Sequence, residues 1–202
     1  MIVVNCEQGS PEWFAAKCGI PSASNFDKIV TTKGDPSKQA QKYMYQLAAE
    51  RVTGRSEESY SNATMQRGIE MEAEARDLYE MLRDLEVQQV GVCFPDEKKL
   101  YAASPDGLVG EDGILEIKCP MAYASVGYLL KGDDLLGEYF QQVQVQLLVT
   151  GRKWSDLISY YPGLRPVVLR VDRDEKFITA LRLELVKFCA ELDGVVKTLA
   201  SD

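Results

Sequence analysis

The stretch from Tyr101 to Pro120 constrains the fold more than any other part of the chain. Two short apolar runs, Leu108-Val109 and Ile114-Leu115, flank the turn sequence Gly110-Glu111-Asp112-Gly113. Apolar runs joined by such a turn are typical of a tight β-hairpin. The sequence therefore predicts two antiparallel strands here, and with them which residues lie opposite one another.

This hairpin would bring Asp106 back beside Glu116. Alternate residues of a strand point to the same face, so Glu116 and Lys118 emerge together, while Ile117 turns into the core and offers only its carbonyl. Carboxylate and carbonyl oxygens suit a hard cation such as Mg²⁺ or Mn²⁺, and a nearby lysine can orient or deprotonate water. The pattern indicates a metal-dependent phosphodiester hydrolase, although these side chains could also simply face solvent.

Residue content excludes several other kinds of chemistry. The chain of 202 residues contains no histidine, which excludes serine–histidine triads and histidine general bases. Five scattered cysteines, none in a Cys-x-x-Cys pair, indicate reduced and mostly buried thiols rather than disulfides or a zinc site. They are Cys6, Cys18, Cys93, Cys119 and Cys189.

The charge and hydropathy of the chain predict an acidic cytoplasmic protein. No apolar run is long enough to cross a membrane, and the N-terminal residues lack the basic region of a signal peptide. The formal net charge of −8 disfavours nonspecific binding to nucleic acid. An enzyme that encloses DNA needs positive charge only along its channel, so the acidic balance does not exclude a nuclease.

The hairpin sequence resembles a known family. Ser104-Pro105-Asp106-Gly107, followed by Leu115-Glu116-Ile117-Lys118-Cys119-Pro120, closely resembles the core of the phage lambda exonuclease family (YqaJ-like viral recombinases), within the PD-(D/E)xK nuclease superfamily. The resemblance implies a restriction-endonuclease-like fold. It also implies that Asp106 bridges two Mg²⁺ or Mn²⁺ ions and that Glu116 and the Ile117 carbonyl complete one metal site.

The N-terminal segment extends the resemblance. Trp13-x3-Lys17-x-Gly19-Ile20-x-Ser22-Ala23-Ser24 is similar to the opening signature of the family, in which a basic residue and a serine hold the 5′-phosphate of the digested strand. By this resemblance Lys17, Ser24 and Ser104 form a 5′-phosphate site. Lys17 occupies a position where the family often has arginine. Lysine keeps the positive charge but cannot form the paired, bidentate hydrogen bonds of a guanidinium group. Helix capping alone would also explain the serines.

Two later motifs add candidate catalytic residues. Gly68-x3-Glu72-x2-Ala75-Arg76 resembles the family helix whose glutamate reaches the metal centre, although periodicity alone leaves Glu70, Glu72 and Glu74 equally suitable. Tyr139-x2-Gln142 resembles the Tyr-x2-Gln that places a glutamine near the attacking water or the scissile phosphate. A polar helix face would also explain the glutamines.

The chain as a whole predicts an α/β fold with a mixed central β-sheet flanked by helices. Helices are expected at 11–17, from 22, at 37–53, at 64–85 with Thr64 as cap, from after Pro120 to 130, at 138–150 after a loop at 132–134, and from 174. Strands are expected at 87–94, 100–103, 156–161 and 167–171. We expect one nuclease domain over 1–202, with a helical N-terminal segment over 1–63, a metal-binding core over 64–171 and a terminal helix over 174–200. A polar linker is expected at 55–62.

The resemblance implies a specific activity. It is that of an ATP-independent, Mg²⁺-dependent exonuclease that digests the 5′-ended strand of linear duplex DNA and leaves 3′ single strands for recombination by single-strand annealing. Lys118 and Gln142 would position the nucleophilic water, and Glu72 would support the metal site. Members of the family form a homotrimeric ring around DNA and work with a single-strand annealing protein.

Two other functions remain open. A RecB-like or Cas4-like nuclease shares the fold but usually carries four cysteines for an iron–sulfur cluster, which the scattered cysteines here disfavour. A DNA-binding module with a degenerate nuclease core is the other alternative, and the intact set of Asp106, Glu116 and Lys118 disfavours it.

Overall fold

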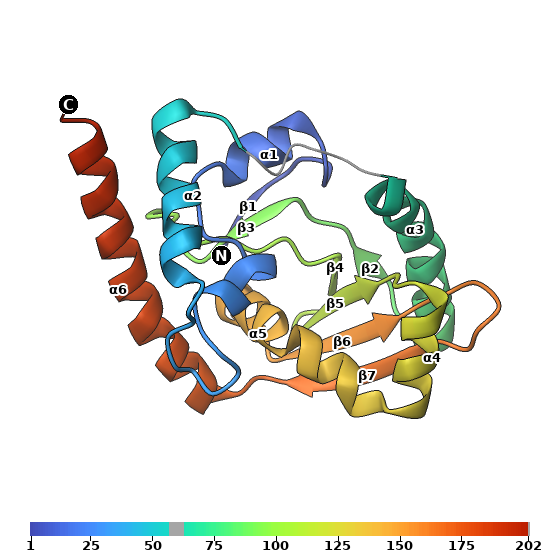
Figure 1. Cartoon of the computed structure of the whole chain (residues 1–202). Coiled ribbons are helices and arrows are strands. Elements are labelled where there is room, and N and C mark those ends of the chain that lie inside the picture. The colour runs from blue at the N-terminus through green and yellow to red at the C-terminus, as the bar shows by residue number, and fades with distance from the viewer. Residues whose placement is uncertain (57–62, 202) are drawn as a thin grey trace.

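The computed structural model describes residues 1–56 and 63–201 (Figure 1). Its helices are α1 (Pro11–Lys17), the 3₁₀ helix η1 (Ala23–Lys28), α2 (Ala40–Thr53), α3 (Ala63–Arg83), α4 (Ala122–Leu130), α5 (Gly132–Thr150) and α6 (Glu175–Leu199). Its strands are β1 (Ile2–Val4), β2 (Val87–Gln88), β3 (Val92–Phe94), β4 (Gly107–Val109), β5 (Gly113–Lys118), β6 (Trp154–Ser159) and β7 (Val167–Asp172).

A five-stranded mixed sheet forms the centre of the molecule. Its strand order is β2-β4-β5-β6-β7, with β5 and β6 parallel and the other neighbouring pairs antiparallel. A separate two-stranded sheet pairs β1 with β3, so the N-terminal segment joins the core. The predicted α/β class with a mixed central sheet is confirmed.

The predicted hairpin is present. β4 and β5 pair antiparallel, with Gly107 opposite Leu115 and Val109 opposite Gly113. The chain reverses at Gly110, whose φ of 51° lies in the left-handed region that glycine adopts at little cost. The pairing brings the chain just before β4 alongside the C-terminal half of β5.

The two faces of the sheet bury different helices. Ile114 belongs to a core that includes Val143 and Leu147 of α5, whereas Leu115 and Ile117 belong to a second core that includes Tyr79 of α3. This alternation follows from the period of two in a strand. α5 therefore covers one face of β5 and α3 the other (Figure 1).

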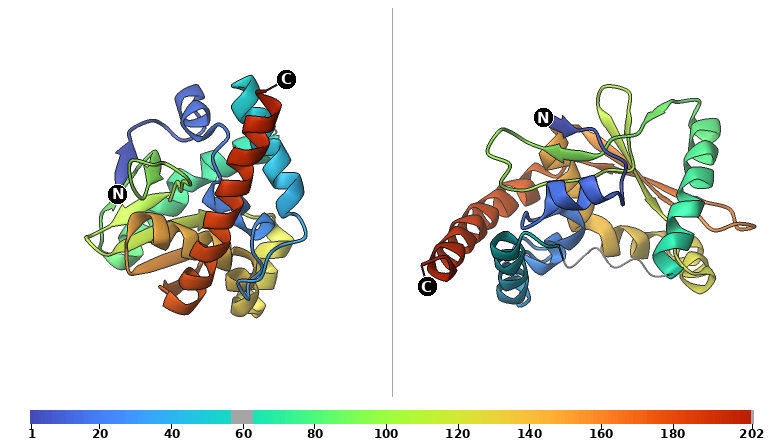
Figure 2. Two further views of the ribbon diagram at one scale, coloured as in Figure 1. Left: turned by 90° about the vertical axis from the view of Figure 1, so that its left-hand side faces the viewer. Right: turned by 90° about the horizontal axis from the view of Figure 1, so that it is seen from above.

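The C-terminal helix packs against α2 rather than on the sheet. α6 runs beside α2 in all views (Figures 1 and 2), and the rings of Tyr43 and Phe188 stack with centroids 6.0 Å apart. Arg51 also pairs with Asp193 at 2.5 Å. The helix begins where predicted, because the Asp174 side chain accepts a hydrogen bond from the amide of Phe177.

A buried ionic network fixes α3 to the sheet. Asp156 of β6 is fully buried and accepts hydrogen bonds from Tyr79 Oη at 2.8 Å and from Arg170 at 2.5 and 3.0 Å. Tyr79 lies seven residues, or two helical turns, after Glu72 and so on the same face of α3. The network therefore sets the position of the helix that carries Glu72.

The strand predicted at 87–94 is two strands, and they belong to different sheets. β2 pairs with β4, while β3 pairs with β1. Gly91 lies between them, where a Cβ atom would come within 2.4 Å of the Val4 carbonyl oxygen, so only glycine permits this close approach. The strand predicted at 100–103 is wrong, since only Ala102 and Ala103 form isolated bridges there.

Several predicted helix boundaries differ from the structure. The segment after Ser22 is a 3₁₀ helix, the helix expected from Ser37 begins at Ala40, and Thr64 lies inside α3 rather than capping it. The loop expected at 132–134 is the first turn of α5, where Asp133 and Asp134 interact favourably with the positive end of the helix dipole. Residues 57–62 of the predicted linker lie outside the described residues.

The cysteines are less buried than expected. All five are free, and Cys93 and Cys189 are buried, but Cys6, Cys18 and Cys119 are partly exposed, so the prediction that most are buried is wrong. Within residues 1–56 and 63–201, no helix combines the length and apolar character needed to span a bilayer.

The Asp156 network leads to a stability prediction. Replacing Tyr79 with Phe leaves the buried carboxylate without one of its donors, which should lower the free energy of unfolding by about 1–3 kcal/mol. Urea unfolding followed by circular dichroism measures the change. The matched control is Tyr123→Phe, because Tyr123 is 81% exposed. Equal stability of the two variants would contradict the role given to the network.

Candidate active site

The centre of the site is a buried carboxylate. Glu116 of β5 is 2% exposed and receives three donors. Its Oε1 atom lies 2.7 Å from Lys118 Nζ and 2.5 Å from Gln142 Nε2, and its Oε2 atom lies 2.5 Å from Gln146 Nε2. Both glutamines come from α5, which packs on the face of β5 that carries Glu116. A charge buried this deeply requires such a complete set of partners.

Asp106 lies next to this carboxylate because of the hairpin. Its Oδ2 atom accepts a hydrogen bond from the amide of Ile117 at 2.6 Å. The preceding loop is held by Gln8, whose side chain donates to the carbonyl of Pro105 at 2.9 Å. Burial raises the pKa of Asp106 well above its usual range, and the charges of Glu116 and Glu72 raise it further. Three acidic groups thus crowd one region.

Lys118 is the cation of the cluster. Besides its contact with Glu116, its ammonium donates to Gln142 Oε1 at 3.1 Å and lies 4.5 Å from the centroid of the Tyr139 ring. Burial lowers the pKa of Lys118, but Glu116 and Asp106 raise it by more, so the net shift is upward. The lysine is therefore held in its charged form beside the acidic groups.

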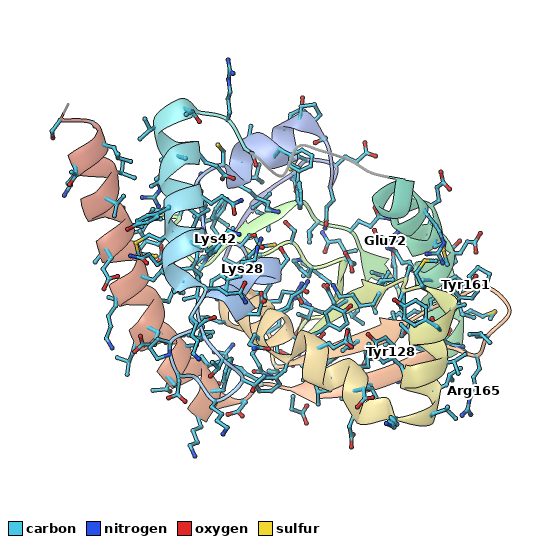
Figure 3. The ribbon with its side chains drawn as sticks, in the orientation of Figure 1. Lys28, Lys42, Glu72, Tyr128, Tyr161 and Arg165 are labelled. Carbon is cyan, nitrogen blue, oxygen red and sulfur yellow. The ribbon has the colours of Figure 1, made fainter. Side chains whose placement is uncertain are left out.

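Glu72 is the glutamate of α3 that faces the cluster. It projects from α3 toward the middle of the molecule (Figure 3), and its pKa is raised by burial and by the charge of Glu116, against the lowering effects of Arg76 and Lys118. Glu70 and Glu74 are both exposed, and Glu74 accepts a hydrogen bond from Tyr160 Oη at 3.0 Å. The structure thus identifies Glu72 as the one of these three glutamates that faces the cluster, which helical periodicity alone could not do.

An open cleft reaches this cluster from the side of α3. Its volume is about 260 Å³, and it is lined by Glu72, Arg76 and Asp106 together with residues of the N-terminal segment. The Nε atom of Arg76 is buried and has no hydrogen-bond partner among the described residues. The cleft thus offers both carboxylates and a cation to an incoming phosphate-bearing ligand.

The donor set fits a hard divalent cation. Within residues 1–56 and 63–201, no three His, Cys, Asp or Glu side chains are gathered closely enough to hold a metal ion as they stand. Mg²⁺, however, usually takes only one or two protein carboxylates and completes its shell with water and phosphate oxygens. Asp106 and Glu116, mutually repelling and joined to a lysine, provide that pair.

The residues predicted to bind a 5′-phosphate fall into two neighbouring groups. In the first, Trp13 links two of them, since its indole Nε1 donates to Ser104 Oγ at 2.9 Å and its ring lies 3.4 Å from Lys17 Nζ. Lys17 is only 8% exposed. Ser104 precedes Asp106 by two residues, so this group adjoins the acidic cluster.

The second group surrounds Ser24. Its exposed hydroxyl lies 3.4 Å from both Ser22 Oγ and Asn25 Nδ2, and Asn25 accepts a hydrogen bond from Lys28 Nζ at 2.5 Å. The amide of Ala23 donates to the carbonyl of Ala102 at 3.0 Å, which holds this segment beside the chain that leads to Ser104. Lys28 lies on η1, between α2 and the centre of the molecule (Figure 3).

Sequence reasoning overlooked Gln146. It lies four residues after Gln142 on α5, is fully buried, and binds the second oxygen of Glu116. The spacing of one helical turn between the two glutamines was the available signal, since it places both amides on one helix face. Asn25 forms hydrogen bonds with Ser22, Ser24 and Lys28. It was also overlooked, because no spacing in the sequence indicated these contacts.

The mixed sheet, with Asp106, Glu116 and Lys118 gathered at its hairpin, defines a nuclease of the PD-(D/E)xK type. Residues 12–153 match the YqaJ-like viral recombinase domain. Because the match covers more than half of the chain, the chain belongs to the YqaJ-like viral recombinase family, as predicted, and is a nuclease that acts on DNA.

Solved structures agree with this assignment. The alkaline exonuclease LHK-Exo of Laribacter hongkongensis is 35% identical, with 95% of this chain and 97% of that chain covered and a TM-score of 0.85. Its complex with dAMP gives 36% identity, coverage of 94% and 96%, and the same TM-score. A phage related exonuclease from Haemophilus somnus, 15% identical with coverage of 89% and 96% and a TM-score of 0.70, shares the fold. No curated protein sequence matches significantly.

The different surroundings of Glu72 and Glu74 lead to a prediction. Glu72→Gln removes a charge that interacts with Glu116 and should slow DNA degradation about 10–100-fold, the usual effect of disturbing residues around a metal site. Glu74→Gln makes the same chemical change at an exposed position of the same helix and should leave the rate nearly unchanged. Release of acid-soluble nucleotides measures both, and equal losses would contradict the assignment.

Proposed function

We propose that the chain is a Mg²⁺-dependent, ATP-independent exonuclease that digests the 5′-ended strand of linear duplex DNA. The observation that carries this proposal is the buried Glu116 carboxylate, bound by Lys118 and Gln142 beside Asp106. These residues supply the acidic, cationic and amide groups that phosphodiester hydrolysis requires in a chain without histidine. Family membership supports the same function.

Asp106, Glu116, the Ile117 carbonyl and Glu72 would hold the cation. The family implies two Mg²⁺ or Mn²⁺ ions, which the carboxylates of Asp106, Glu116 and Glu72 would help to hold. When bound, such ions stabilise the charge that develops on the phosphate and lower the pKa of water. The oxygen-only ligand set supports this placement, as do the raised pKa of Asp106, due to burial and the charges of Glu116 and Glu72, and the raised pKa of Glu72, due to burial and the charge of Glu116.

Lys118 and Gln142 would act on the water and the phosphate. Both lie on the Oε1 side of Glu116, where Lys118 is 19% exposed at its side chain and Gln142 is also partly exposed. The charged ammonium can donate a hydrogen bond to the attacking water or to a phosphate oxygen, and the Gln142 amide can both donate and accept. Because Gln142 contacts Lys118 and Glu116, the three groups would move little between encounters with substrate.

Strand polarity would come from a 5′-phosphate site formed by Lys17, Ser24 and Ser104. A terminal phosphate carries nearly two charges and three acceptors, so a lysine and two hydroxyls would bind it by charge-assisted hydrogen bonds. Because Ser104 lies two residues before Asp106, a phosphate bound there would lie close to the proposed cleavage site. The remaining 3′-ended strand would stay intact.

The biological setting follows the family. We propose that the 3′ single strands serve homologous recombination by single-strand annealing in the cytoplasm of a bacterial host. The partner would be a single-strand annealing protein, and three copies of this chain would surround the duplex. The net charge of −8 supports enclosure, because an acidic subunit needs a confined basic surface to hold DNA.

Metal dependence can be tested with two substitutions. Asp106→Asn removes a proposed ligand and should abolish degradation of linear duplex in Mg²⁺ and weaken Mn²⁺ binding. Lys118→Ala should abolish degradation while Mn²⁺ still binds. Activity assays without ATP, paired with calorimetric Mn²⁺ titration, measure both. A wild-type protein that binds DNA but cleaves none in Mg²⁺ would instead identify a degenerate DNA-binding module.

The 5′-phosphate site predicts a preference between DNA ends. Duplex with 5′-phosphates should be degraded faster than the same duplex with 5′-hydroxyls. Lys17→Ala should remove about 1–3 kcal/mol of this preference, the range for hydrogen bonds to charged groups, chiefly by slowing the phosphorylated substrate. Lys33→Ala, in an exposed loop, is the matched control. A Lys17→Ala enzyme that discriminates as fully as the wild type would refute the site.

A further inference from the structure

The two oxygens of Glu116 have different surroundings. Oε1 receives Lys118 and Gln142, both of which are partly exposed at the edge of the site. Oε2 receives Gln146, whose exposed fraction is 0%. One oxygen therefore faces groups that substrate can reach, and the other faces the interior of the protein.

The orientation of the Gln146 side-chain amide provides a donor for Glu116 but no donor for the amide's own oxygen. Gln146 Nε2 donates to Glu116, while Gln146 Oε1 is buried and has no hydrogen-bond partner among the described residues. Exchanging the two ends of the amide would direct its oxygen at a carboxylate, which repels it. A buried oxygen without a hydrogen bond lowers the stability of the folded protein. An apolar side chain at position 146 would have no such oxygen, but it would leave Glu116 Oε2 without a donor.

We propose that Gln146 is a positioning residue that locks Glu116 Oε2 from the interior and thereby keeps Oε1 directed at the cation and the substrate. The inference rests on the proposed metal-dependent function. Gln142 cannot perform this task, because it binds Oε1, the same oxygen as Lys118, and does not contact Oε2. The contact with Gln146 lies out of reach of solvent, since Gln146 is 0% and Glu116 2% exposed.

Loss of this contact would free the carboxylate to rotate. A glutamate whose terminal torsion is unrestrained has a broad range of orientations, so fewer of its conformations present Oε1 correctly. Outer residues that orient metal ligands typically contribute about 10–100-fold to metal affinity or activity. The expected signature is therefore weaker metal binding by a folded protein.

The same helix provides a matched control two residues away. Gln144 is also fully buried, but its Nε2 donates to the carbonyl of Asp172 at 2.9 Å and its Oε1 accepts from the amide of Asp174 at 2.8 Å. It ties α5 to the junction between β7 and α6 and does not contact Glu116. Gln144→Met and Gln146→Met thus remove equally buried amides with different partners.

The experiment compares Mn²⁺ affinity and thermal stability in the two variants. Calorimetric titration with MnCl₂ below the melting temperature should show about 10–100-fold weaker binding for Gln146→Met, with a matching fall in kcat on linear duplex. Gln144→Met should lower Tm yet keep the wild-type Mn²⁺ affinity. If Gln146→Met does not fold, Gln146→Asn, which keeps the amide but is one methylene too short, should show the same weakened binding.

Wild-type Mn²⁺ affinity in a folded Gln146→Met or Gln146→Asn protein would overturn the proposal. Equal weakening by Gln144→Met and Gln146→Met would also overturn it, since both would then act through general destabilisation. A wild-type protein that binds no Mn²⁺ would refute the proposed metal site itself and this inference with it. The two failures are therefore distinguishable by the wild-type titration alone.

Discussion

The burial of the Glu116 carboxylate is the constraint on which the rest of the site depends. A charge that is 2% exposed is tolerated only with strong partners, and here they are one ammonium and two amides. The amides come from adjacent turns of α5, so this helix must lie along β5 with one particular face toward it. Burial of Val143 and Leu147 on the sheet enforces that orientation.

α3 meets a similar constraint on the opposite face of the sheet. The buried Asp156 requires Tyr79 and Arg170, and Tyr79 fixes α3 at a point two turns from Glu72. Two buried carboxylates on neighbouring strands thus position two helices, one on each face. The acidic cluster forms where the hairpin brings Asp106 alongside the end of β5, between these helices.

Patterns among neighbouring residues predicted the structural features that depend on neighbouring residues, such as turns and the alternation of side chains along a strand. The turn at Gly110 and the alternation along β5 correctly placed Asp106, Glu116 and Lys118 together. Contacts between distant segments were not predictable in this way. The pairing of β1 with β3 divides the segment 87–94 between two sheets, and Glu72 is distinguished from Glu74 only by what each faces across the fold. Gln146 was missed because a buried glutamine resembles any polar residue until its partner is known.

Anomalous diffraction from crystals grown with Mn²⁺ is the decisive measurement for the metal site, because it reports where the cation lies independently of catalysis. We expect a manganese peak bound by the carboxylates of Asp106 and Glu116, with Gln146 still bonded to Glu116 Oε2. A peak held by other residues, or none at Mn²⁺ concentrations that support DNA cleavage, would contradict it.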